Sequence, residues 1–186
     1  MKSDSWIVLQ TFFRRELEVS AYLRQRKVPH FIPMHYREKM QSDGHTQRVL
    51  APIIHNYTFV ENVLPQKELK TVLSGCSVPL HILCHKDTGE PCEISNSEMF
   101  EFRTLCDPQF DTKMIVTDQP MDLEVGRDVE IVHGHFSGIR GRLVRKQKQY
   151  WFVKTFAGLS VHLRITRWFC RPLSPVSSPL ASVSPA

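Results

Sequence analysis

The chain has 186 residues, 41% hydrophobic and 23% charged, with a formal net charge of +5, which fits a globular protein with one core or two small ones. No apolar run approaches the roughly 20 residues that a membrane-spanning helix needs, and the polar first residues lead directly into a strand-like run. We therefore expect a cytoplasmic protein with neither a signal peptide nor a membrane partner.

The first two elements are predicted from a change in the periodicity of the hydrophobic residues. Residues 6–13 are apolar on both faces and rich in β-branched and aromatic side chains, which predicts an interior strand. Residues 14–27 contain no Gly or Pro and predict a helix that ends at Val28, the residue before a proline. The charged side chains of this helix, Glu16 among them, are expected in water. The side chains expected on its buried side are Phe13, Leu17, Ala21, Leu23 and Val28.

The next part of the chain is predicted to form a hairpin and a strand. Residues 30–41 and 46–50 predict two arms, joined by a turn with an Asp-Gly pair. Residues 53–60 form a strongly β run, in which Ile54 is expected on one face and Tyr57 on the other.

The remainder of the N-terminal half is predicted as two helices and a strand. The predicted ranges are a helix over 65–74, a strand over 78–85 and a helix over 95–106, capped by Ser95 or Ser97. The order of elements predicts an α+β domain over residues 1–108, an antiparallel sheet flanked by helices.

The C-terminal half has an all-β texture. Residues 109–125 lack apolar periodicity and are predicted to be a linker. Five short β runs follow, at 129–132, 142–145, 150–154, 159–163 and 168–169. They predict a small barrel over residues 126–172, and the uncharged Ser/Pro-rich residues 173–186 are expected to be a disordered tail.

Positive charge is concentrated in the predicted barrel. Residues 1–126 hold 14 Lys and Arg against 17 Asp and Glu, whereas residues 127–172 hold 10 against 2. A basic segment of this kind is typical of a protein whose partner is nucleic acid or an acidic protein surface.

Two sets of motifs resemble those of NusG-type transcription factors. The segment 128–154 resembles the KOW motif, with a strand, G-x-F from Gly134, a glycine at Gly141 and a second strand. Residues 6–10, 31–33 and 51–60 resemble the W-Y-V, F-x-P and P-L-x-P-x-Y-x-F-V motifs of the NusG N-terminal domain. The resemblance covers about residues 5–172. It implies a NusG N-terminal domain followed by a KOW or SH3-like barrel, in a transcription elongation or antitermination factor that is not an enzyme and needs no cofactor.

The resemblance also implies a site for RNA polymerase. The N-terminal domain is expected to bind the clamp helices of the largest polymerase subunit through an apolar concavity. By motif position the candidate contacts are Ile54 and Tyr57, and Trp6 and Phe59 support the same sheet. The alternative is that all four belong only to the core. His55 stands where proline is usual, which indicates a specialised paralogue such as those of the RfaH or UpxY branches.

Several cations are candidates for contacts with non-template DNA or nascent RNA. In the N-terminal half they are Arg14 and Arg15 on the first helix and Arg37 and Lys39 on the hairpin. In the barrel they are Arg140, Arg142, Arg145, Lys146 and Lys148, interleaved with Tyr150 and Trp151 as in RNA-binding surfaces. The resemblance also implies Rho or a ribosomal protein as a partner of the barrel. The alternative for each group is a solvated charged surface.

Other classes of function stay open. One is a KOW-containing protein that binds RNA or the ribosome. A metal-dependent enzyme is disfavoured, because the five cysteines include no C-x-x-C pair and the set His81, Cys84, His85 and Cys92 lacks zinc-ligand spacing. We expect no metal and a monomer. The second domain masks the polymerase site or changes fold in the RfaH branch, but here its many β-forming residues predict a permanent barrel.

Overall fold

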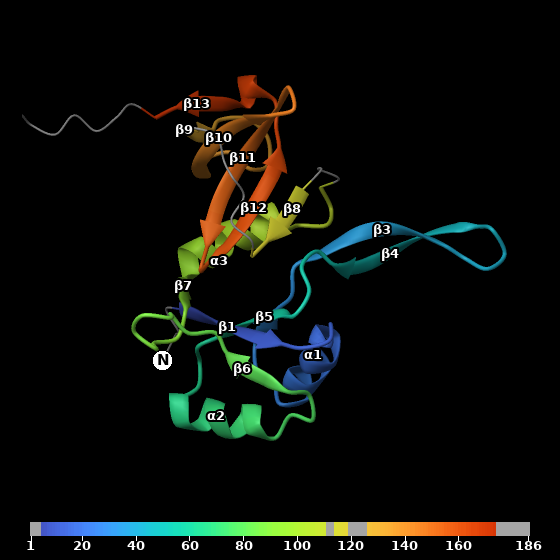
Figure 1. The fold of residues 1–186 in the computed structure, drawn as a ribbon, viewed down its shortest axis with the longest axis vertical. Helices are drawn as coiled ribbons and strands as arrows, with labels where there is room; N and C mark the ends of the chain where they lie inside the picture. Colours follow the sequence, from blue (N-terminus) through green and yellow to red (C-terminus); the bar gives the residue numbers. More distant parts are fainter. Residues whose placement is uncertain (1–4, 111–113, 119–125, 174–186) are drawn as a thin grey trace, which may run out of the picture.

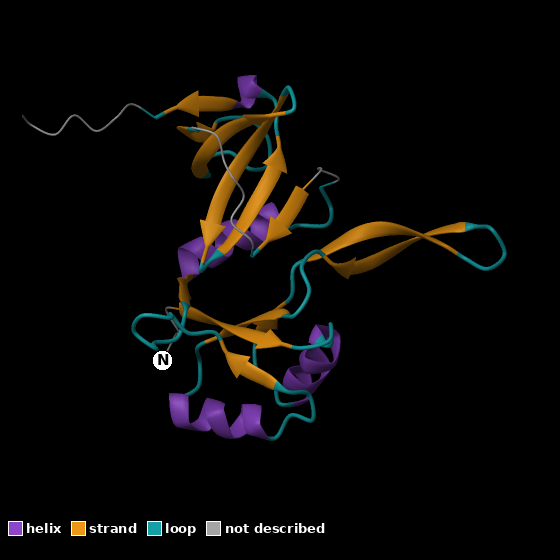
Figure 2. Cartoon of the chain, viewed as in Figure 1, coloured by secondary structure: helices purple, strands orange, loops and turns teal. Residues whose placement is uncertain are grey.

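Two antiparallel sheets and a protruding hairpin make up the chain, with helix α3 (Asn96–Leu105) between the sheets (Figures 1 and 2). The computed structural model describes residues 5–110, 114–118 and 126–173. Among these residues, no helix is long and apolar enough to cross a membrane.

Strand β1 (Ser5–Thr11) is central to the N-terminal sheet. It pairs with β5 (Tyr57–Glu61) on one side and with β6 (Leu80–Ile82) and β7 (Glu93–Ser95) on the other, and β2 (His30–Phe31) extends the sheet beyond β5. Because side chains alternate along a strand, β1 contributes to two cores. Ile7 and Leu9 pack with α1 (Glu16–Gln25) and α2 (Gln66–Ser74), whereas Trp6 and Val8 belong to the core that contains α3.

The predicted buried side of the first helix is confirmed for Leu23 and Val28 and is wrong for Phe13, Leu17 and Ala21. Leu17 is 51% exposed and Phe13 is 86% exposed, whereas the carboxylate of Glu16 is buried. The physical reason is a change of phase before the helix. Phe13 and Arg14 have φ of 60° and 56°, in the left-handed region, so the helix begins two residues later than predicted and presents another face to the sheet.

The hairpin is built from β3 (Met34–Met40) and β4 (Thr46–Pro52), which extend away from the rest of the domain (Figure 1). The predicted turn is confirmed, with Gly44 at φ +82°. The first arm is not continuous, because the chain leaves the sheet between β2 and β3 at Ile32 and Pro33.

The strand predicted over 53–60 begins only at residue 57. Its predicted faces are confirmed within β5, where Tyr57 and Phe59 lie in one core and Val60 in the other, and are wrong for Ile54. Residues 53–56 form a bend in which Asn56 adopts φ 72°, so the alternation of faces is lost before β5 starts. Ile54 consequently lies in the same core as Tyr57 and Phe59.

The helices of the second part of the domain are confirmed. α2 ends at Ser74 before Gly75, and the strand after it is shorter than predicted. Ser95 caps α3, because its hydroxyl accepts a hydrogen bond from the Glu98 amide while the Glu98 carboxylate accepts one from the Ser95 amide. The sequence pattern did not predict β7, whose three residues end at this cap.

The C-terminal sheet has six antiparallel strands in the order β13-β9-β10-β11-β12-β8, which confirms the all-β prediction. The strands are β8 (Met114–Thr117), β9 (Arg127–Ile131), β10 (Arg140–Lys146), β11 (Gln149–Phe156), β12 (Leu159–Arg164) and β13 (Cys170–Pro172). Residues 168–169, predicted as a strand, belong instead to a 3-10 turn, η1 (Arg167–Phe169).

The sequence pattern did not predict β8, which lies within the segment 109–125 and pairs with β12. Residues 111–113 and 119–125 of that segment, and the predicted tail beyond residue 173, lie outside the described residues. The domain boundaries at 108 and 126 stay a prediction.

Candidate functional site

A buried carboxylate shapes the loop that leads into β5. Glu16, on the first turn of α1, is 1% exposed. Its Oε1 lies 2.7 Å from Nδ1 of His55, and its Oε2 accepts a hydrogen bond of 3.2 Å from the Asn56 amide. The Asn56 side chain in turn accepts a 2.8 Å hydrogen bond from the Arg14 amide. These contacts hold the loop so that Ile54 points into the core below α3.

Tyr57 joins the two halves of the chain by a hydrogen bond. Its hydroxyl donates to Oδ2 of Asp118 at 2.9 Å and accepts from Nε2 of Gln10 at 3.3 Å. Burial, with a smaller effect of the Asp118 hydrogen bond, raises the pKa of Tyr57 to about 12. The neutral phenol is therefore the form that this site stabilises.

The raised pKa gives a testable alkaline titration. The folded-state pKa lies above the ordinary value of 10.0, so the contact stabilises the fold fully below pH 10 and is lost as the pH rises towards 12. We expect Asp118→Asn to lower the pKa of Tyr57, measured by the ultraviolet absorbance of tyrosinate. Tyr57→Phe identifies the titration step, because that variant must lack it. An unchanged pKa in Asp118→Asn would contradict the assigned contact.

Phe59 and Trp6 complete the group of four candidate residues. The ring of Phe59 is fully buried, 4.9 Å from the ring of Phe102 on α3. Trp6 donates from its indole nitrogen to Oδ1 of Asn96 at 2.9 Å. The structure thus gathers all four candidates on the side of the sheet that faces α3, and all four are buried.

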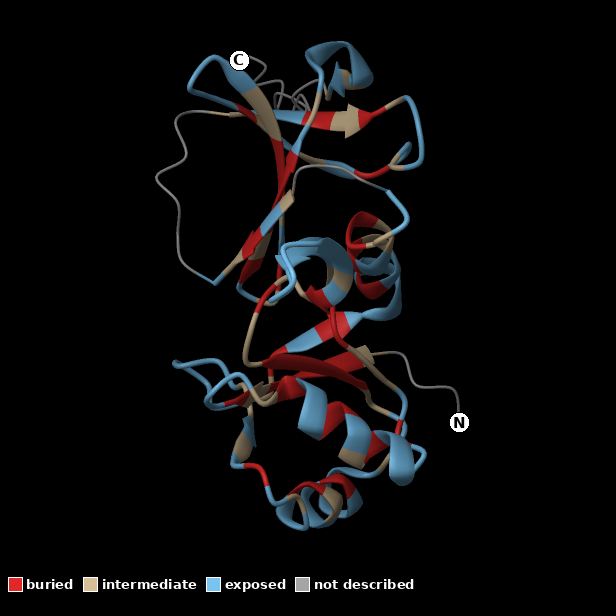
Figure 3. Ribbon diagram, turned by 90° about the vertical axis from the view of Figure 1, so that its right-hand side faces the viewer, coloured by how far each residue is buried: buried red, intermediate tan, exposed pale blue. Residues whose placement is uncertain are grey.

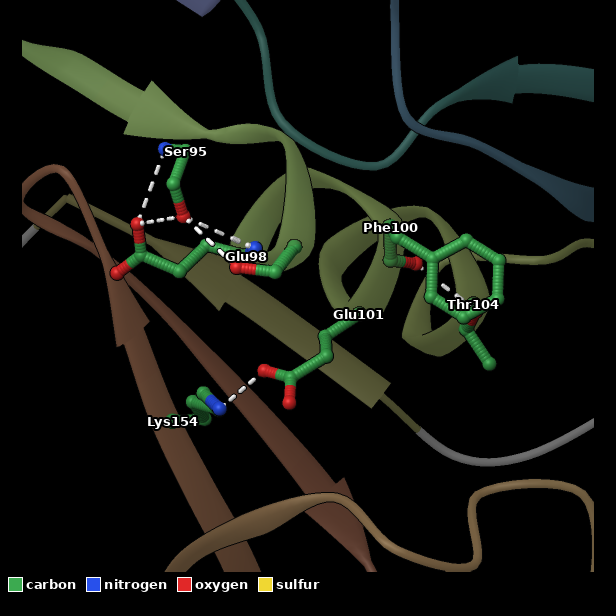
Figure 4. A network of polar contacts seen from close by, with 7 residues as sticks. Ser95, Glu98, Phe100, Glu101, Thr104 and Lys154 are labelled. Atoms are coloured by element: carbon green, nitrogen blue, oxygen red, sulfur yellow. Dashed lines mark hydrogen bonds and ion pairs between the residues drawn. The ribbon is translucent and has the colours of Figure 1, made fainter. Parts of the chain in front are cut away.

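The C-terminal sheet covers α3 on its other side. Phe102 lies 5.1 Å from Phe156 of β11, and Lys154 of β11 forms an ion pair with Glu101 of α3 (Figure 4). Buried residues continue from the N-terminal sheet through α3 into the C-terminal sheet as one apolar cluster (Figure 3). The candidate polymerase-binding residues are therefore covered by the rest of the same chain.

A hollow of about 420 Å³ remains open at the base of the hairpin. Met34, Tyr36 and Ile53 line it from the hairpin side, and Cys106 and Phe110 line it from the end of α3 and the segment after it. The ring of Phe110 stacks on His135 of the C-terminal domain at 3.6 Å. Ile53, the chain neighbour of Ile54, lines this hollow, whereas none of the four candidates themselves lines it.

Comparison with known families decides the identity of the N-terminal half. Residues 4–103 match the family described as transcription termination factor NusG, and this match covers more than half of the chain. The chain belongs to the NusG family. Proteins of this family are transcription factors without enzymatic activity, and they bind RNA polymerase. The C-terminal sheet of this NusG-family protein is consistent with a KOW domain. No curated protein matches the chain.

The candidate cations of this NusG-family protein lie in three places. Arg37 and Lys39 are exposed on the protruding hairpin, while Arg14 is exposed before α1. Arg15 forms an ion pair with Glu18, with 2.6 Å between Nη2 and Oε2. In the C-terminal domain, Arg140 pairs with Glu130 and Arg142 with Asp128, whereas the group Arg145, Lys146 and Lys148 lies at the turn between β10 and β11.

Two exposed aromatic positions were not identified from the sequence. Phe13 is held outside by the left-handed turn before α1, and Trp168 is 82% exposed on η1. The sequence signal for Trp168 was Arg167 directly before it, since a charged neighbour is more usual near exposed positions than in a core strand. Within the described ranges, no three His, Cys, Asp or Glu side chains gather as a metal site.

Proposed function

We propose that this NusG-family protein is a transcription elongation or antitermination factor that binds the clamp helices of the largest RNA polymerase subunit. The observation that carries the proposal is the gathering of four motif-position residues, Ile54 and Tyr57 among them, in one cluster around α3, with Ile53 next to them in the chain at the hollow below the hairpin. In the complex, the two clamp helices of polymerase would pack between the hairpin and α3 and bury these few anchors. A few buried anchors supply most of the binding energy in helix-in-groove interfaces.

Polymerase binding at these anchors requires a rearrangement. Tyr57 is bonded to Asp118, and α3 is covered by Phe156 and Lys154 of the C-terminal sheet. The packed conformation is therefore the form that does not offer the anchors, and the C-terminal domain has to move away for the clamp helices to reach them. A ligand shifts such an equilibrium by its differential affinity for the open form.

The cations supplement this contact in the proposed function. Arg37 and Lys39 lie on the protruding hairpin, where they can reach the phosphates of non-template DNA beside the bound polymerase. The C-terminal domain then recruits RNA or a protein such as Rho or a ribosomal protein. The proposed place of action is the cytoplasm, where bacterial RNA polymerase works.

A second candidate function is that of a KOW-containing protein that binds RNA or the ribosome without polymerase. It is favoured by the cations and aromatic residues at the β10–β11 turn, which do not depend on the N-terminal domain. Binding to purified polymerase separates the two functions.

The test measures binding of the immobilised full chain to purified bacterial RNA polymerase. We expect the double variant Ile54→Asp, Tyr57→Ala to reduce capture at least tenfold, as loss of central anchors does in other interfaces (about 2 kcal/mol or more). Because both side chains are buried, the half-buried Ile53→Asp at the rim of the hollow is a second variant that disturbs the core less.

Val63→Asp is the matched control. It places the same charge at an exposed apolar position beyond the far end of β5 and should leave capture unchanged. Circular dichroism and the unfolding midpoint verify that each variant is folded. Undiminished capture by folded Ile53→Asp and by the double variant would refute the proposed surface.

A further inference from the structure

Trp168 is presented to solvent by a fixed backbone. η1 follows β12, and the Phe169 amide donates to the Thr166 carbonyl at 2.9 Å. The Phe169 carbonyl then accepts from the Val132 amide at 2.8 Å, which ties the turn to the end of β9. Tryptophan is highly buried on average, so a Trp that is 82% exposed on an ordered turn is unusual.

Five cations lie at the same end of the C-terminal sheet. Arg145 and Lys146 end β10, Lys148 lies in the turn, Arg164 ends β12 and Arg167 begins η1. In the described part of the chain none of these five forms an ion pair. We call these five cations, together with Tyr150, Trp151 and Trp168, the distal basic face.

The acidic residues of the domain do not neutralise this face. Residues 127–172 contain Asp128 and Glu130 as their acidic residues. Asp128 pairs with Arg142, and Glu130 pairs with Arg140 and Arg171, all outside the distal basic face. The positive charge of the face is therefore available to an anionic ligand.

Two aromatic residues of β11 lie opposite cations of the neighbouring strands. The Arg145 guanidinium lies 5.8 Å from the ring centre of Tyr150, and Trp151 stands opposite Arg164 in the β11–β12 register. The Ile165 amide donates to the Tyr150 carbonyl at 3.1 Å, so the chain that leads into η1 runs beside Tyr150. The half-buried Tyr150 and Trp151 therefore lie beside the segment that leads to the exposed Trp168.

We propose that the distal basic face binds single-stranded RNA, with the indole of Trp168 stacked on an unpaired base and the five cations beside the phosphates. Bases of a duplex are already stacked on each other, so a protruding indole favours an unpaired strand. The dense cation set favours a polyanion over an apolar protein surface. RNA is the chosen strand because a polymerase-bound factor of the NusG family works beside an emerging transcript.

The face is accessible in the packed conformation. It lies at the end of the C-terminal sheet remote from α3, whereas Phe156 and Lys154 at the other end of β11 contact α3 (Figure 1). RNA binding therefore does not require release of the C-terminal domain. The inference rests on the proposed function, in which this domain recruits RNA, and adds the surface and the stacking residue that would bind it.

The experiment measures binding of the full chain to a fluorescent polyuridine RNA of about 12 nucleotides, within the usual site size for single-strand binding. We expect Trp168→Ala to weaken binding about tenfold and Trp168→Phe to retain most of it, because stacking needs a ring. Arg167→Glu should remove at least one phosphate contact. The slope of log affinity against log salt concentration should therefore become shallower by about 1 or more. Phe100→Ala, at a 73% exposed aromatic on α3, is the matched control and should bind as the wild type does.

Further comparisons separate the alternatives. Equal or weaker binding of polydeoxythymidine supports the proposal, whereas tighter binding of that DNA or of duplex RNA overturns it. The absence of RNA binding by the wild type, or full binding by Trp168→Ala, would also overturn it, and capture of a ribosomal protein without RNA would assign the face to protein. Polymerase capture by Trp168→Ala should equal that of the wild type, so failure of this proposal is distinguishable from failure of the proposed polymerase contact.

Discussion

Replacing Lys154 by glutamate is expected to increase capture of RNA polymerase by the full chain about fivefold, the factor that roughly 1 kcal/mol gives. Lys154 and Glu101 form an ion pair between β11 and α3, with side chains that are 20% and 30% exposed. The hydroxyl of Ser95 and, to a smaller extent, Lys154 hold the pKa of Glu98 below its usual range, so a second carboxylate lies near this lysine. A glutamate at position 154 would therefore face two like charges in a partly desolvated contact, which favours release of the C-terminal sheet.

The double reversal Glu101→Lys, Lys154→Glu tests whether the effect comes from this contact. Opposite charges again face each other in that variant, so capture should return towards the wild-type level, as a double-mutant cycle requires for interacting residues. Arg127→Glu is the matched control, because it reverses a charge at an exposed position of the same domain. Size-exclusion chromatography and the unfolding midpoint verify the fold. If Lys154→Glu leaves capture unchanged, the packed conformation does not limit access to the polymerase-binding surface.

The sequence predicted the elements where local chemistry decides them. The Ser95 cap, the Asp-Gly turn and the stop of α2 at Gly75 each depend on a few neighbouring residues, and each is found as predicted. The β-strands of the C-terminal half also follow from local sequence, because runs of β-branched and aromatic residues favour strands.

The errors arise where distant residues decide the local structure. Glu16 is charged and was therefore predicted to be exposed on its helix. Its burial depends on contacts with His55 and Asn56, some 40 positions away. The same contacts end the alternation of faces before β5. The prediction assumed that the alternation continued, and it therefore placed Ile54 on the wrong side of the sheet. β8 was missed because a four-residue strand becomes recognisable only when β12 pairs with it.

That the four candidate residues bind polymerase stays a prediction, and the sequence did not predict that they are buried together. Motif positions identified Trp6, Ile54, Tyr57 and Phe59, and the structure places all four around α3. Phe59 and Trp6 are covered by α3, and Tyr57 is bonded to Asp118. Phe156 and Lys154 of the C-terminal sheet cover α3 in turn, and the periodicity of the sequence does not report these long-range contacts. In the proposed function, the four residues are core residues in the packed conformation and become a binding surface only when the C-terminal sheet is released.

Replacing Gly141 by alanine is expected to destabilise the C-terminal sheet by about 1–3 kcal/mol or more, as overpacking of a close contact does. A Cβ at this position would lie 2.5 Å from Cζ of Phe152 and 2.6 Å from the Val153 carbonyl oxygen. The carbonyl is backbone and cannot turn aside, so β10 and β11 have to separate. The predicted need for glycine at this KOW position is thereby explained by geometry.

The measurement combines thermal unfolding with the two binding assays. Gly44→Ala is the control, because no heavy atom lies within 4 Å of its added Cβ and only the strain of φ +82° remains. Loosening the C-terminal sheet should weaken RNA binding, which depends on the alignment of β10, β11 and η1, while it uncovers Ile54 and Tyr57 for polymerase. We therefore expect the two affinities to change in opposite directions in Gly141→Ala. A parallel loss of both would mean that the N-terminal surface needs the C-terminal sheet for its own fold, which would contradict a C-terminal domain that can be released.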